Sequence, residues 1–246
     1  MDRNVKLDVA EDQGEKELKD IKGYLAIIGS LMYAALATRP DIPFAVAELC
    51  WYNSCPFTSH LTADKRVLHY PKSIANFRLH FSSSSSSNCN DQLTGYMDSD
   101  WANDSADRIS QGGHVFLLIN GAVSWQSRKQ DLIAMSTVEA EYIACSESSH
   151  EAQWLLQLHR DTHGKDTSPL PINCDNQGAL SHITTGIIKA STKHIKVCCR
   201  NSRDLHARKI VVYFYLHTNE TVADILTNPL MKDEHEKFTK AMRLWY

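Results

Sequence analysis

The chain reads Gly95-Tyr96-Met97-Asp98-Ser99-Asp100-Trp101 where a predicted strand over residues 93–98 ends on a carboxylate. A carboxylate beside an apolar strand costs free energy unless something compensates its charge. Three other acids occupy comparable positions, at strand ends or helix starts: Glu141, Asp175 and Asp224. Hard divalent cations such as Mg²⁺ and Mn²⁺ are suited to such oxygen ligands. Four converging carboxylates would hold two ions about 3.5–4 Å apart, the arrangement that hydrolyses phosphodiesters.

Each acid also has an ordinary explanation. Asp98 or Asp100 can mark a strand end, Asp175 with Asn176 can cap the following helix, and Asp224 can lie on a solvated helical face. Taken singly, the residues favour these explanations. Their combination and order favour one metal site.

The composition is that of a soluble globular protein. Hydrophobic residues make up 43% and charged residues 22% of the 246 positions. The net charge of −3 means that any nucleic acid must be bound by a local basic patch. The seven cysteines form no C-x-x-C pair, which indicates reduced thiols and not a disulfide framework or a structural zinc site. Neither a signal peptide nor a membrane span is evident, so we expect an intracellular protein with no membrane partner.

A run of six serines, Ser82 to Ser87, marks the predicted domain boundary, because such a run cannot bury apolar area. We expect a loose N-terminal extension over 1–20, a helical segment over 21–81, a linker over 82–90 and a second domain over 91–246. Within the helical segment, the helix that begins near residue 63 should end or kink at Pro71.

The second domain reads as three strands followed by alternating helices and strands. The strands are predicted over 93–98, 113–120, 122–127, 171–174 and 210–216, with a hairpin turn at Asn120-Gly121. Helices are predicted over 136–158, from 176, over 192–206 and from 220. The inward face of the first is assigned to Ala140, Ile143, Ala144, Trp154 and Leu158. This order predicts an α/β fold with a mixed sheet flanked by helices.

Several motifs resemble those of one family, in the same order. The segments GYMDSDWA (95–102), VSWQSRKQ (123–130), STVEAEY (136–142), CDNQ (174–177) and ADILT (223–227) resemble the ribonuclease H domain of copia-type retrotransposon Pol polyproteins. Upstream, IGSLMY (28–33) and ATRPDI (37–42) resemble the end of the reverse transcriptase of the same family. The resemblance covers about Ile21 to Met242. It implies a ribonuclease H-like five-stranded mixed sheet, with strands 1-2-3 antiparallel and the others parallel, beside a small helical N-terminal segment.

The resemblance also implies an activity, which is endonucleolytic hydrolysis of the RNA strand of RNA–DNA hybrids by a two-metal mechanism. Carried over by motif, the catalytic residues and ligands of two Mg²⁺ (or Mn²⁺) ions are Asp98, Glu141, Asp175 and Asp224. Glu139 competes with Glu141, but residues two apart on a helix lie about 200° apart, so only one can face the site. Asp100 is the alternate to Asp98. The implied partners are the hybrid and an upstream reverse transcriptase domain, and the implied location is the cytoplasm, including virus-like particles, or the nucleus.

A basic stripe is the candidate nucleic-acid surface. Its members follow spacings of four, three, four and three, which place them on one helical face: Lys189, Lys193, Lys196, Arg200 and Arg203. Phosphates would bind such a face, and the alternative is a solvated basic helix. Ser124 and Arg128 are weaker candidates.

Some residues depart from the family pattern. The stretch Ile195 to Asn201 replaces a helix that is acidic and then aromatic in the family, and Asn228 stands where a lysine is usual. The catalytic acids of a reverse transcriptase are absent, so this chain cannot polymerise DNA. The alternative function is therefore a catalytically inactive transposon relic that retains at most nucleic-acid or protein binding. An integrase-type nuclease matches the motifs less well.

Overall fold

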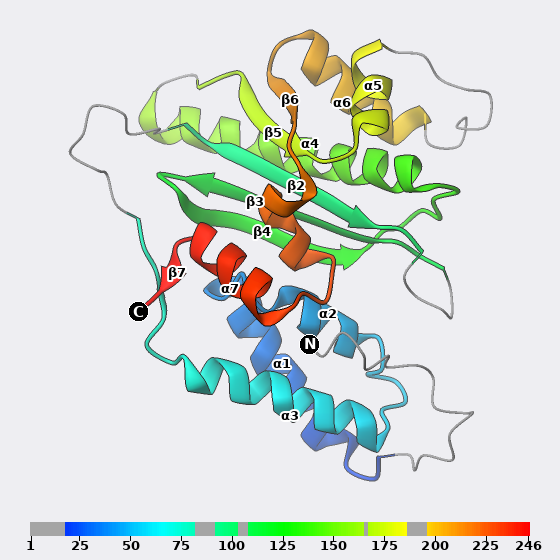
Figure 1. Cartoon of the computed structure of the whole chain (residues 1–246), viewed down its shortest axis with the longest axis vertical. Coiled ribbons are helices and arrows are strands. Elements are labelled where there is room, and N and C mark those ends of the chain that lie inside the picture. The colour runs from blue at the N-terminus through cyan, green and yellow to red at the C-terminus, as the bar shows by residue number, and fades with distance from the viewer. Residues whose placement is uncertain (1–17, 82–91, 103–107, 165–166, 186–195) are drawn as a thin grey trace.

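A computed structural model describes residues 18–81, 92–102, 108–164, 167–185 and 196–246 (Figure 1). Most of the predicted N-terminal extension and all of the serine-rich linker lie outside these ranges. So do Lys189 and Lys193 of the basic stripe. The structure therefore leaves the predicted domain boundary untested.

A five-stranded sheet forms the centre of the molecule. Its strands are β2 (Thr94–Asp100), β3 (Gln111–Leu118), β4 (Gly121–Lys129), β5 (Leu170–Cys174) and β6 (Val211–Tyr215), in the order β4-β3-β2-β5-β6. Strands β2, β3 and β4 are antiparallel, whereas β5 pairs in parallel with both β2 and β6. This confirms the predicted ribonuclease H-like mixed sheet. The predicted hairpin between β3 and β4 is present, but its turn lies one residue earlier than predicted. Its two central residues are Ile119 and Asn120, with positive φ values of 52° and 62°, and Gly121 is the first residue of β4.

Helix α4 (Thr137–His163) covers one face of the sheet, with α5 (Gln177–Thr185) and α6 (Lys196–Ala207) beyond it (Figure 1). Ser136 caps the N-terminus of α4 through its hydroxyl, and Gly164 ends the helix at a φ of 65°. Ala140, Ile143 and Ala144 are buried as predicted.

The inward assignment of Trp154 and Leu158 was wrong, since they are 57% and 44% exposed. Leu155 and Leu156 point into the core instead, together with smaller residues one and two turns earlier. Ser149 and Ala152 are buried, and the Ser149 hydroxyl hydrogen-bonds with Tyr213 of β6 and donates to Ser202 of α6 (3.2 Å).

The other face of the sheet is covered by short helical segments. These are η3 (Thr218–Glu220), η4 (Val222–Leu226) and α7 (Lys232–Ala241). A continuous terminal helix from residue 220 was predicted, and this was wrong. Pro229 separates η4 from α7, because proline cannot continue the backbone hydrogen bonding of a helix. Val222, Ile225 and Leu226 of η4 pack with Phe238 of α7 in a core of their own.

The N-terminal helices are α1 (Ile21–Ala37), α2 (Pro43–Cys50) and α3 (Thr58–Ser73). They share a core that includes Tyr24, Ile28 and Leu49. Helix α3 begins five residues before the predicted start at residue 63, continues through Pro71 and ends two residues later, at Ser73. None of the helices in the described ranges combines the length and apolar character needed to cross a membrane.

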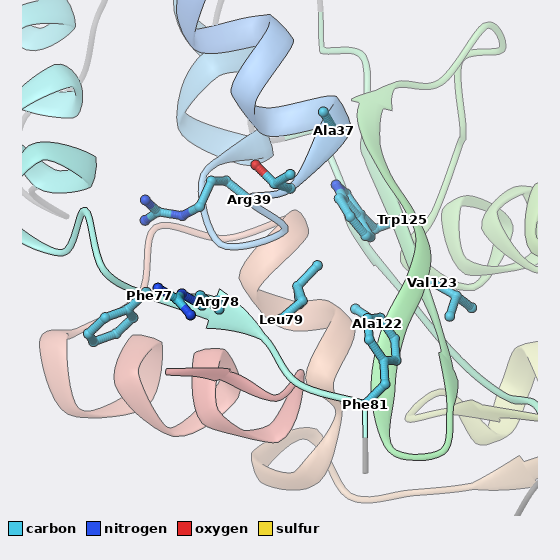
Figure 2. A pocket seen from close by; sticks show the side chains of 10 residues that line it. Ala37, Arg39, Phe77, Arg78, Leu79, Phe81, Ala122, Val123 and Trp125 are labelled. Atoms are coloured by element: carbon cyan, nitrogen blue, oxygen red, sulfur yellow. The ribbon is translucent and has the colours of Figure 1, made fainter. Parts of the chain in front are cut away.

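The N-terminal helices are joined to the sheet by specific contacts. The indole N–H of Trp125 on β4 donates to the Ala35 carbonyl (2.7 Å), and Nε2 of His235 on α7 donates to the Asp41 carbonyl (3.0 Å). The segment 21–81 is not helical throughout, since β1 (Arg78–Leu79) pairs antiparallel with β7 (Leu244–Trp245). A groove of about 640 Å³ lies at this junction, where Arg39, Phe81 and Trp125 are among the lining side chains (Figure 2).

One buried acid in the N-terminal helices makes stability depend on pH. Asp64 on α3 is fully buried, and neither carboxylate oxygen has a hydrogen-bond partner among the described residues. Burial raises the pKa of Asp64 to about 6, with Lys65 opposing. The unfolded value is about 3.9. Because the folded-state pKa is the higher one, Asp64 destabilises the fold increasingly as the pH rises from about 4 through 6.

We therefore expect Asp64→Asn to raise the free energy of unfolding at pH 7.5 by about 1–3 kcal/mol, and to have much less effect at pH 4, since each pKa unit is worth about 1.4 kcal/mol. Urea denaturation of both proteins across this pH range measures the difference. Asp161→Asn, at an exposed position on α4, is the control. A difference between Asp64→Asn and the parent that does not vary with pH would contradict this account.

Candidate metal centre

Asp98 lies within the central strand β2 and is 4% exposed. On the neighbouring strand its partner is Gly113. A Cβ atom on Gly113 would lie 2.7 Å from Cβ of Leu226 and 2.9 Å from Cγ2 of Thr227. The absence of a side chain therefore lets the end of η4 approach the sheet, and the Thr227 hydroxyl donates a short hydrogen bond to Oδ2 of Asp98.

Glu141 reaches the same site from the first turns of α4. The backbone N–H of Ser99, next to Asp98, donates to Oε1 of Glu141 (3.2 Å). The competing residue Glu139 has a different role. Its carboxylate accepts from the backbone N–H of Met135 (2.8 Å), as in a helix-capping arrangement. Of the two glutamates, Glu141 is the one that lies beside Asp98.

Asp175 follows the last residue of β5, which is parallel to β2. Ligand atoms of Glu141, Cys174 and Asp175 all lie within 4.8 Å of one another. The hydroxyl of Thr218 donates to Oδ2 of Asp175 (2.5 Å). The sequence analysis did not assign Cys174 to the site. Its position beside Asp175 was the only signal, and strand alternation alone would have pointed it away from that residue.

Asp224 is supplied by η4. The side-chain amide of Asn228 donates both to Oδ1 of Asp224 (2.6 Å) and to Oδ2 of Asp98 (3.4 Å). One nitrogen thus bridges the two carboxylates. All four predicted acids are brought together at one end of the central strands. Thr227 and Asn228 were not assigned to the site, although Thr227 ends the ADILT motif and Asn228 departs from the family's usual lysine. Those two observations were the signals that could have found them.

The charges of the acids interact strongly. Burial, and then the charges of Asp224, Asp175 and Asp100, raise the pKa of Asp98 to about 7, against the hydrogen bond from Thr227. Burial and the charge of Asp98 raise the pKa of Glu141 well above its ordinary value. Asp100, two residues from Asp98 and on the same face of β2, has a pKa raised to about 6 by burial and by Asp224.

This donor set fits a hard divalent cation. The carboxylate oxygens are crowded and buried, and in the described part of the chain neither Asp98 nor Glu141 forms an ion pair with a lysine or arginine. A cation would relieve the repulsion that raises these pKa values. The Cys174 thiol adds a soft donor beside these oxygens.

The residues predicted to bind nucleic acid differ in their exposure and in their contacts. Arg200 is exposed and Arg203 half-buried on α6, while the side chain of Lys196 lies outside the described residues. The Ser124 hydroxyl donates to Glu151 (2.6 Å), and Arg128 pairs with two carboxylates, Asp131 (3.2 Å) and Glu147 (3.1 Å). These contacts argue against Ser124 and Arg128 as phosphate ligands, since both are already engaged.

The chain is similar to several curated proteins. It is 33% identical to a retrovirus-related Pol polyprotein from transposon RE1 of Arabidopsis thaliana, over 90% of this chain and 15% of that protein. It is 35% identical to the corresponding protein from transposon TNT 1-94 of Nicotiana tabacum, over 87% of this chain and 16% of that protein. It thus spans about 15% of these relatives' length. It is also 42% identical to secreted RxLR effector protein 161 of Plasmopara viticola, over 57% of this chain and 96% of that protein. No family profile matches the chain.

Among solved structures, a similar one is that of LC11-RNase H1 in complex with an RNA/DNA hybrid. The TM-score is 0.42 and the identity 13%, over 56% of this chain and 94% of that one.

The roles of the two glutamates can be separated by metal binding. We expect Glu141→Gln to weaken Mn²⁺ binding by at least about tenfold, because it removes a ligand charge. Glu139→Gln should change it less than about twofold, because glutamine can still accept the capping hydrogen bond. Isothermal titration with Mn²⁺ at pH 7.5 measures both. Equal loss in the two variants would contradict the assignment.

The close approach at Gly113 gives a second expectation. Gly113→Ala should push η4 away from β3, lower stability by about 1–3 kcal/mol and weaken Mn²⁺ binding. Gly29→Ala on α1 is a matched control, since a Cβ there meets no atom within 4 Å. The control should gain up to about 1 kcal/mol, because alanine favours a helix interior. Thermal unfolding and Mn²⁺ titration would refute the expectation if Gly113→Ala behaved like Gly29→Ala.

Proposed function

Since the chain belongs to the family of copia-type retrotransposon Pol polyproteins, we propose that its ribonuclease H-like domain hydrolyses the RNA strand of RNA–DNA hybrids. The observation that carries the proposal is the gathering of Asp98, Glu141, Asp175 and Asp224 around one buried, strongly negative site. In the full-length polyprotein the domain would act beside the upstream reverse transcriptase.

The four acids would hold two Mg²⁺ or Mn²⁺ ions. Ions bound there would supply Lewis acidity, both to activate a water molecule as the nucleophile and to neutralise the leaving 3′ oxygen. The protein's own contribution is to fix the ligands. Ser99 orients Glu141 through its backbone N–H, and Thr227 and Asn228 orient Asp98 from the opposite face of the sheet. Ligands held in this way lose little freedom when the substrate binds.

A candidate phosphate-binding surface lies on α6. Arg200 is exposed there, three residues before Arg203. With a net charge of −3 for the whole chain, the substrate must be attracted by a local group of cations of this kind. Lys189, Lys193 and Lys196 extend the same stripe in the sequence. We propose that these five side chains contact the backbone of the hybrid.

A binding-only relic is the second candidate. It is favoured by Asn228, whose amide donates to two of the four acids where the family usually has a lysine. An uncharged amide leaves the acids less compensated than a lysine would. The two candidates differ in whether metal-dependent cleavage occurs.

We expect the purified chain to cleave the RNA of an RNA–DNA hybrid with Mg²⁺ or Mn²⁺ and to leave duplex DNA intact. Asp98→Asn should abolish cleavage and raise thermal stability in the absence of metal, because it removes one of several repelling carboxylates at constant volume. Gel analysis of a labelled hybrid measures the cleavage. A folded parent protein that binds the hybrid without cleaving it would establish the relic function instead.

Binding of the hybrid should depend steeply on salt. In the Asp98→Asn background, replacing Arg200 and Arg203 together by alanine should lower the slope of log K against log salt concentration by about one to two. Arg208→Ala is the matched control, because Arg208 is paired with Asp204 (3.2 Å) at the end of the same helix. Fluorescence anisotropy at roughly 50 to 300 mM KCl measures the slopes. Over this range the Debye length falls from about 14 to about 6 Å. Equal slopes in all three proteins would remove α6 from the interface.

A further inference from the structure

An exposed tryptophan lies next to the candidate metal centre. Trp101 directly follows Asp100, at the end of β2, and is 42% exposed. Its ring is fixed in place, because the indole N–H donates to the Ala134 carbonyl (3.0 Å). The following residue is held as well, since the backbone N–H of Ala102 donates to the Ser110 hydroxyl (3.3 Å). The ring therefore presents a rigid apolar surface to solvent.

Two further apolar side chains flank the residue that Trp101 holds. Ile133 and Met135, on either side of the buried Ala134, are 58% and 71% exposed. Trp101, Ile133 and Met135 are called the Trp101 surface here. Three large apolar side chains gathered at an exposed site indicate a contact surface more than chance exposure.

The Trp101 surface is continuous with the metal centre on both of its segments. On β2, Ser99 donates to Glu141 two residues before Trp101. In the loop before α4, the backbone N–H of Met135 donates to Glu139, two residues before Glu141. The Trp101 surface is therefore within reach of a nucleic acid whose phosphate lies at the four acids. Its occupant is therefore the substrate of the proposed function, on which this inference rests.

The chemistry of a duplex limits what can contact the surface. The faces of paired bases are covered by their neighbours, so a protein ring reaches mainly the sugar edges in the grooves. An A-form groove that displays sugars and base edges is wide and shallow, whereas the minor groove of B-form DNA is only about 6 Å wide. A broad apolar surface can enter the wide, shallow minor groove of an A-form duplex but not the narrow minor groove of B-form DNA.

We propose that the Trp101 surface packs against the sugar edges in the shallow minor groove of the RNA–DNA hybrid. Trp101 thereby acts as a specificity-determining residue that favours hybrid over duplex DNA. The indole supplies most of the contact, because an aromatic ring offers a large area with little conformational freedom to lose. The hydrogen bond to Ala134 keeps the ring in position for this role.

The test measures binding in the Asp98→Asn background, so that no cleavage intervenes. Dissociation constants for an RNA–DNA hybrid and for duplex DNA of the same sequence are determined for Trp101→Ala, Trp101→Phe and Trp154→Ala. Trp154→Ala is the matched control, because Trp154 is more exposed than Trp101 and lies about 20 Å along α4 from Glu141.

We expect Trp101→Ala to weaken hybrid binding about tenfold, which is about 1.4 kcal/mol, with duplex DNA affinity unchanged. Trp101→Phe should lose less than about threefold, and Trp154→Ala should bind as its parent does. Unchanged circular dichroism and Mn²⁺ affinity in the variants would show that the loss is not one of folding.

Several results would overturn the inference. One is a Trp101→Ala protein that binds hybrid as tightly as its parent, and another is a loss that is equal for hybrid and duplex DNA. A Trp101→Phe protein as impaired as Trp101→Ala would assign the effect to the Ala134 hydrogen bond and not to the ring surface. A folded parent that binds no hybrid would overturn the proposed function, and this inference with it.

Discussion

The burial of two like charges, Asp98 and Glu141, is the constraint on which the rest of the structure depends. Each is almost fully removed from water, and each raises the cost of ionising the other. The fold meets this cost with dedicated donors. The Ser99 backbone N–H on β2 donates to Glu141, and the Thr227 and Asn228 side chains after η4 donate to Asp98. The start of α4 and the end of η4 are thereby fixed relative to β2. A shift of either element would leave a buried carboxylate without its donor, which is far more costly than the loss of an ordinary surface hydrogen bond.

The same constraint explains how the N-terminal helices are used. For Thr227 to reach Asp98, η4 must lie directly on the sheet at Gly113, and an element this short has little surface with which to hold itself there. Helix α2 contacts both η4 and β4, and α7, which packs on η4, is tied to the loop after α1 through His235 and Asp41. The N-terminal helices therefore brace the segment that carries Asp224. They are joined to the sheet by packing and hydrogen bonds, in addition to the serine-rich segment that links them in the sequence.

Local sequence patterns predicted those elements whose structure is decided by residues close together in the chain. The strands were predicted to within about two residues, and Asn120-Gly121 indicated the hairpin, whose turn lies one residue earlier. The two-residue offset on a helix showed that only one of Glu139 and Glu141 could face the site, and the family resemblance selected Glu141. The predictions failed where a distant partner decides. Trp154 and Leu158 were placed inward because they are apolar, yet the neighbouring Leu155 and Leu156 are the side chains that enter the core. One turn or more earlier, Ser149 is buried because its hydroxyl contacts Tyr213 and Ser202. The contribution of Thr227 to the site depends on the missing side chain of Gly113, 114 positions earlier in the numbering of the chain. The spacing of residues within one helix or strand cannot predict a contact between residues so far apart in the sequence.

The energetics of the site bear on which of the two candidate functions is the better explanation. Nothing in the packing around Asp98 requires a charge, since an amide of the same volume would fill the same space and still accept from Thr227. Retaining ionisable groups there lowers the stability of the metal-free protein, because burial and mutual repulsion both oppose ionisation. Groups that cost stability and are nonetheless held in place by dedicated donors are typical of functional sites. A binding-only protein would need the basic face of α6 and no such cluster. The cost of the four acids is accounted for when a divalent cation binds among them, which is why the geometry favours the hydrolase over the relic.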